Sequence, residues 1–85
     1  MPANKHRKTL DAIFQTPTPA NIRWSDIENM LTAYGGQVEE RAGSRVLVRL
    51  NDRRAVFHRP HPKPETDRGA VVALRRFLTE AGLKP

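Results

Sequence analysis

Two histidines, His58 and His61, stand in the most basic part of this 85-residue chain. Imidazole gives and takes protons readily near neutral pH, so the pair is suited to general acid–base chemistry. The surrounding segment, residues 41–63, bears seven cationic side chains against one acidic residue, Asp52, and its charge of +6 equals the net charge of the whole chain. Such a concentration of positive charge predicts a polyanionic partner, and RNA is the partner that we favour.

The charge and the histidines also have less specific interpretations. A generally basic surface fits the uneven distribution poorly, because residues 1–40 carry −1 and residues 64–85 carry +1. An interaction protein whose basic face meets an acidic partner stays open. His58 could instead be a surface histidine on a solvated strand, and His61, between two prolines, could be a loop histidine with only local hydrogen bonds.

Composition limits the class of protein further. The chain has no cysteine, and its three histidines lack the spacing or the carboxylates of a metal site, so we expect neither a metal nor a small-molecule cofactor. Its length predicts a single domain over residues 1–85, with a shallow groove rather than a deep pocket. No apolar run approaches the roughly 20 residues of a membrane span, and no signal peptide is evident. We therefore expect a soluble cytoplasmic protein without membrane contact.

Three helices are predicted to support the basic segment. Apolar residues at helical spacing indicate helices over residues 5–15, over a segment that ends at Gly35-Gly36, and roughly over residues 67–81. Ser25 and Glu28 have the spacing of a capping box, which predicts that the second helix begins after Ser25.

Three strands are predicted between the second and third helices, where the period changes from 3.6 residues to 2. Residues 37–41, 45–50 and 55–59 read as an antiparallel meander. The fold class is therefore α+β, in the order α-α-β-β-β-α, with the helices packed on one face of a three-stranded antiparallel sheet.

The strand register predicts which side chains the helices leave uncovered. A hairpin turn centred on Asp52 and Arg53 would pair Val48 with Phe57 on an apolar face. His58 would then lie on the opposite face, because side chains alternate along a strand. A slip of one residue would expose Phe57 and bury His58. In this register His58 shares its face with Arg45 and Arg49, each about 8 Å away on a diagonal.

Several short motifs from about Trp24 to Leu83 resemble the HicA family of bacterial toxins. Their order and spacing agree with the family along this whole stretch, while residues 5–15 lie outside its minimal core. The matching motifs are Leu31-Thr32-Ala33-Tyr34-Gly35-Gly36, Gly43-Ser44-Arg45, Phe57-His58-Arg59-Pro60-His61, and the segment from Gly69 to Ala81-Gly82-Leu83.

The resemblance implies a fold like that of double-stranded-RNA-binding domains. It also implies an mRNA-cleaving toxin, an mRNA interferase, that a HicB-type antitoxin holds inactive. Members of the family are thought to cut RNA without a metal, using the histidine of a Gly-Ser-His motif. In this chain Arg45 occupies the third position of that motif.

This departure leaves two hypotheses. In the first, which we favour, His58 takes over the proton transfer and His61 is the second catalytic residue. In the second, the protein binds RNA without cutting it. Either hypothesis predicts the same RNA-binding residues: Ser44, Arg45, Arg49, Arg54, Arg59 and Lys63.

Overall fold

The protein has the predicted α+β fold, in which the spacing of apolar residues changes from helical to alternating after the second helix. The computed structural model describes residues 3–85; Met1 and Pro2, which the single-domain prediction includes, lie outside the described residues. The helices are α1 (Asn4–Ile13), α2 (Trp24–Ala33) and α3 (Arg68–Glu80), and the strands are β1 (Ile22–Arg23), β2 (Gln37–Glu40), β3 (Arg45–Leu50), β4 (Arg53–His58) and β5 (Glu65–Thr66).

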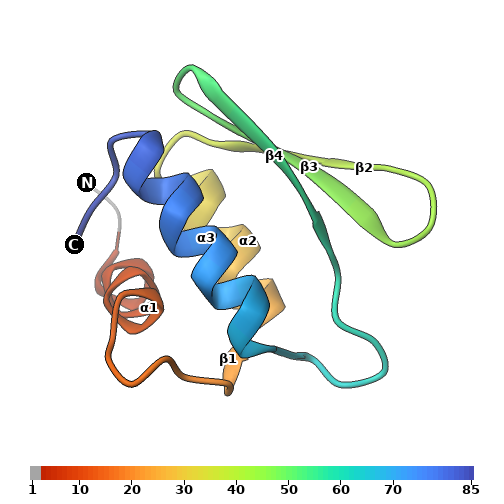
Figure 1. Ribbon diagram of the computed structural model, residues 1–85. Helices are drawn as coiled ribbons and strands as arrows, with labels where there is room; N and C mark the ends of the chain where they lie inside the picture. Colours follow the sequence, from red (N-terminus) through yellow and green to blue (C-terminus); the bar gives the residue numbers. More distant parts are fainter. Residues whose placement is uncertain (1–2) are drawn as a thin grey trace.

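The main sheet has the antiparallel order β2-β3-β4, and helices cover one of its faces. Helices α2 and α3 lie against the sheet, and α1 packs against these two helices on the side away from it (Figure 1). The inward side chains of Val46, Val48 and Phe57 join residues of all three helices in one buried cluster. The predicted helix order and the three-stranded meander are therefore confirmed.

A second, two-stranded sheet was not predicted. Strands β1 and β5 pair antiparallel, with Ile22 opposite Thr66 and Arg23 opposite Glu65. The backbone N–H of Trp24 extends this contact by donating to the carbonyl of Pro64 at 3.0 Å. Strands of two residues are too short to give a periodic signal, but this pair ties the entry to α2 to the entry to α3.

Helix α2 begins earlier than the capping box predicted. Its first residue is Trp24, its N-cap is Arg23, and no side chain caps its N-terminus. Ser25 lies inside the helix, and the Glu28 carboxylate accepts a hydrogen bond from the Trp24 indole instead of from the backbone. The indole of Trp24 is buried against Phe57, with ring centroids 6.0 Å apart, so its burial sets the start of the helix.

Helices α2 and α3 end shortly before glycines, whereas α1 ends at Ile13, two residues before its predicted end. Gly35 has a φ of +92° just after α2, and Gly82 has a φ of +84° just after α3, a conformation that favours glycine. Asp67 caps α3, since its Oδ1 accepts from the backbone N–H of Ala70 at 2.8 Å. The predicted end of the second helix at Gly35-Gly36 is thus confirmed.

The turn between β3 and β4 lies one residue earlier than predicted. Its two residues are Asn51 and Asp52, so that Leu50 faces Arg53. Asn51 adopts a φ of +54°, which asparagine tolerates better than most residues, and its side-chain amide donates to the carbonyl of Ala81 at 2.6 Å. This contact with the end of α3 was invisible in the sequence. The register therefore differs by two residues from the prediction, a shift that leaves every side chain on its predicted face.

Helix α1 is fastened to the rest of the protein by an arginine of α3. Leu10 and Ile13 are buried in the common core. The guanidinium of Arg75 donates to the carbonyl of Ile13 at 3.0 and 3.1 Å and to the carbonyl of Gln15 at 3.1 Å. These carbonyls lie at and just after the end of α1, where no following helical turn supplies N–H donors for them. Arg75 provides the hydrogen bonds instead.

Replacement of Arg75 by alanine is expected to lower the free energy of unfolding by about 1.5–3 kcal/mol, the range for hydrogen bonds to a charged group. Chemical denaturation of the purified protein measures the change. Arg76→Ala is the matched control, because Arg76 is exposed on the same helix and should cost less than about 0.5 kcal/mol. Equal losses in the two variants would contradict the role given to Arg75.

Candidate functional site

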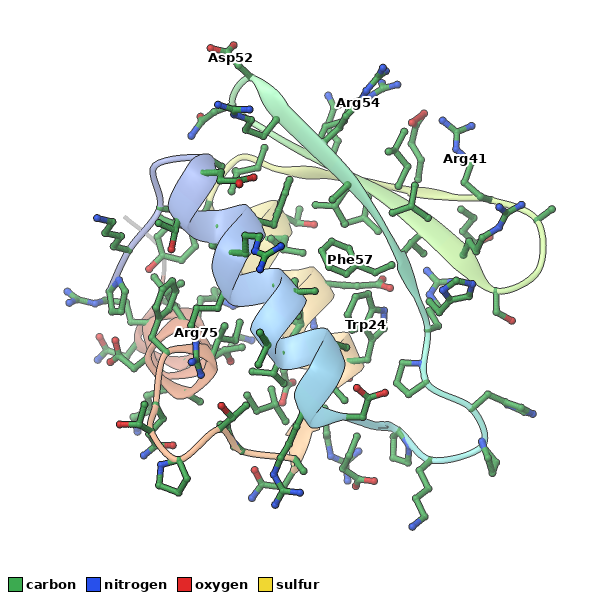
Figure 2. All side chains as sticks on the ribbon, in the orientation of Figure 1. Trp24, Arg41, Asp52, Arg54, Phe57 and Arg75 are labelled. Atoms are coloured by element: carbon green, nitrogen blue, oxygen red, sulfur yellow. The ribbon has the colours of Figure 1, made fainter. Side chains whose placement is uncertain are left out.

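The face of the main sheet that the helices leave open carries half of the predicted functional residues, namely Arg45, Arg49, Arg54 and His58. Side chains alternate across the pleat: Phe57 of β4 points toward the helices, where it meets Trp24 of α2, whereas Arg41 and Arg54 point away from them (Figure 2). By the observed register, the residues of this open face are Gln37, Glu39, Arg41, Arg45, Leu47, Arg49, Arg54, Val56 and His58.

His58 and Arg45 are direct cross-strand partners on the open face. The backbone N–H of Arg59 donates to the carbonyl of Ser44 at 2.9 Å, so the pair is of the non-hydrogen-bonded type. In such pairs the Cβ atoms lie about 4.5–5.5 Å apart, the closer of the two arrangements. Both side chains are exposed, as predicted. The Nε of Arg45 donates to the carbonyl of Ala42 at 2.9 Å, which directs the guanidinium toward the loop before β3.

Arg49 lies farther from His58 than predicted. Its partner on β4 is Arg54. Along the hairpin from the Arg45–His58 pair toward the turn, the Leu47–Val56 pair comes first and the Arg49–Arg54 pair lies two pairs after it. The open face therefore has cations near both ends of the hairpin and an apolar centre. Val56 is 53% exposed in this centre, whereas Leu47 is only 7% exposed. Sequence reasoning missed the apolar centre, although the alternation of β3 and β4 already placed both residues on the face of His58.

The two histidines line one groove at the end of β4. The loop after β4 turns back toward β5, and this brings His58 and His61 to the walls of an open groove of about 400 Å³. Lys63 also lines the groove, so the structure gathers two predicted catalytic residues and one predicted RNA contact. The other lining residues are Arg59, Pro60, Pro62, Glu65 and Asp67.

Arg59 lies in the groove wall, but its guanidinium is held by two carboxylates. Its Nε is 2.9 Å from the Oε2 of Glu28, its Nη2 is 3.3 Å from the Oε1 of Glu28, and its Nη1 donates to Glu40. Hydrogen bonds with Glu28, and then with Glu40, raise the pKa of Arg59 above its usual value, so it stays cationic. The interaction fastens the end of β4 to helix α2, next to His58.

Glu28, the carboxylate that holds Arg59, is predicted from the sequence to belong to a capping box instead. Glu28 accepts from both Trp24 and Arg59, and its side chain is 22% exposed. The spacing of four residues between Trp24 and Glu28 indicates that their side chains meet on one helix face. The contact with Arg59 spans 31 residues, and nothing local in the sequence predicts it.

Two kinds of feature, a metal-binding cluster and a membrane-spanning helix, are not found in the described part of the chain. Within residues 3–85, no three His, Cys, Asp or Glu side chains gather closely enough to hold a metal ion. No helix in that range is long and apolar enough to cross a membrane.

Comparison with known proteins gives one match. A family model described as "HicA toxin of bacterial toxin-antitoxin" matches residues 24–83, which is most of the chain. The match begins at the first residue of α2 and therefore contains the sheet, the histidine groove and α3, but not α1. Searches of curated proteins and of solved structures gave no match.

Glu28→Gln is expected to lower the free energy of unfolding by about 1–3 kcal/mol, because the neutral amide leaves a partly buried guanidinium with a weaker partner. Thermal or chemical denaturation measures the loss. Glu39→Gln is the control, since Glu39 pairs with Arg41 and Arg49 at 3.5 Å on the exposed face, where ion pairs contribute about 0–1 kcal/mol. A smaller loss in Glu28→Gln than in Glu39→Gln would show that the Arg59 contact does not hold β4.

Proposed function

Because this chain belongs to the HicA family of toxins from bacterial toxin–antitoxin systems, we propose that it is a metal-independent endoribonuclease that cleaves mRNA. A HicB-type antitoxin neutralises it in this proposal. In this proposal α1 belongs to the same domain as the residues that match the family, a view supported by the burial of its Leu10 and Ile13 in their common core.

The observation that carries the proposal is the cross-strand pairing of Arg45 and His58. Arg45 takes the third position of the Gly-Ser-His motif, in which the family is thought to carry its catalytic histidine. His58 is its direct partner on the neighbouring strand, so the imidazole rises from the same patch of the open face. The chain thereby keeps an imidazole beside that position and adds a guanidinium to it.

The proposed reaction uses these two groups and His61. His58 takes the proton of a ribose 2′-hydroxyl, whose oxygen attacks the adjacent phosphorus. Arg45 stabilises the additional negative charge on the phosphoryl oxygens. His61, across the groove, gives a proton to the leaving 5′-oxygen as its bond to phosphorus breaks. The products are a 2′,3′-cyclic phosphate and a 5′-hydroxyl end, so no bond change requires a further reactant.

RNA is held by the cations around this pair. Arg49 and Arg54 contact phosphates toward the hairpin turn, and Lys63 and Ser44 contact them near the groove. Arg59 lines the groove as well, but its guanidinium is bound to two carboxylates, so it acts chiefly by holding His58 in place. An antitoxin with an acidic surface would block the reaction by covering the same open face.

The central experiment is RNA cleavage by wild-type protein and by His58→Ala in buffer with EDTA. We expect cleavage by the wild type and a loss of about 10²–10⁴-fold in the variant, the contribution of one positioned proton-transfer group. RNA binding and stability should change little, since His58 is exposed. His6→Ala on α1 is the control and should cleave normally.

A second function has one observation in its favour, namely the arginine at the motif position. A protein that binds RNA without cutting it would use Arg45 as a phosphate contact. It would then show salt-dependent binding and no cleavage product in the same assay. Cleavage that is unchanged in His58→Ala would instead remove His58 from the reaction.

A further inference from the structure

Glu65 is one of two acidic residues that line the histidine groove, and the proposed reaction uses neither of them. It lies on β5, where its backbone pairs with Arg23, and its side chain lines the groove together with His58 and His61. The residue is partly buried, and the ion pairs formed among residues 3–85 do not include it. Thr66, the next residue, is buried at 1% exposure, so the alternation of the strand fixes the opposite direction for Glu65.

A carboxylate in this position conflicts with a groove that holds RNA only through phosphates. His58, His61 and Lys63, which also line the groove, are cationic or can become cationic and so attract phosphates. The carboxylate of Glu65 instead repels a phosphate beside it. Asp67 also lines the groove, but its Oδ1 is occupied by the N-terminus of α3. Glu65 is therefore suited to a ligand group that donates hydrogen bonds rather than to a phosphate.

Within RNA, such donors are found on the ribose 2′-hydroxyl groups and on the bases, and only the bases differ from one sequence to another. Cytosine, adenine and guanine carry exocyclic amino groups, and carboxylates accept hydrogen bonds from the N4 amino group of cytosine. Uracil has no amino group, and the carbonyl oxygens on both sides of its N3–H repel a carboxylate that approaches the position of the cytosine amino group. The rings of Pro60 and Pro62 give the groove apolar surface against which a base can lie.

We propose that Glu65 is a specificity residue that accepts a hydrogen bond from the amino group of a base next to the cleaved phosphate. The preferred substrates are RNAs with cytosine, or another amino-bearing base, at that position, and uracil is disfavoured. This inference rests on the proposed function, because it assigns the base that occupies the groove during cleavage.

The test compares the sequence preference of three proteins on an RNA pool that is randomised in sequence, with cleaved ends identified by sequencing. The wild type should prefer amino-bearing bases over uracil at one position by about fivefold or more, as expected for a base contact of about 1 kcal/mol. Glu65→Gln should lose or reverse this preference, because its amide can donate to the carbonyl oxygens of uracil. Glu80→Gln, an exposed change at the end of α3, should keep the wild-type preference.

An unchanged preference in Glu65→Gln would overturn the inference and leave the proposed nuclease standing. A uniform loss on every sequence would also overturn it, since Glu65 would then serve proton transfer rather than base recognition. If the wild type cleaves nothing, the nuclease proposal fails separately. Binding of RNAs with 2′-O-methyl groups, which cannot react, then decides the matter: equal affinity for uracil and amino-bearing variants in wild type and Glu65→Gln would overturn the base contact.

Discussion

The position of the turn between β3 and β4 determines which side chains the protein buries and which it exposes. Asn51 and Asp52 form the turn, and the Asn51 amide is bound to the carbonyl of Ala81 at the end of α3. With the turn fixed, Phe57 enters the core and His58 remains outside. A slip of one residue would exchange the two and destroy both the core and the site, so packing and chemistry depend on the same register.

The hairpin is held to the helix layer at both of its ends. Asn51 joins the turn to α3, and Arg59 joins the end of β4 to Glu28 of α2. The site thus lies on strands whose ends cannot move independently of the core. This matters for the proposed reaction, because a proton-transfer group must be placed within hydrogen-bond reach of a ribose hydroxyl.

The periodicity of the sequence correctly predicted which side chains face the core. It could not predict features that depend on contacts between residues far apart in the chain. Alternation placed His58 outside and Phe57 inside, and the glycines after α2 and α3 marked where these helices end. The exact pairing failed, because the Asn51 contact that fixes the turn spans 30 residues. Glu28 was expected to cap a helix, but its partners are a buried indole and an arginine 31 residues away. The sequence therefore placed Arg45 and His58 on one face, but their direct pairing emerged only from the structure.

Exchange of the two paired residues, in the double variant Arg45→His with His58→Arg, tests this account most directly. If an imidazole and a guanidinium on this one patch carry the reaction, the exchanged protein should cleave RNA at least about a hundredfold faster than a protein that lacks the imidazole, the lower end of the range for such a group. The same RNA, in EDTA, serves for both proteins. A folded double variant that cleaves no faster than His58→Ala would contradict the account.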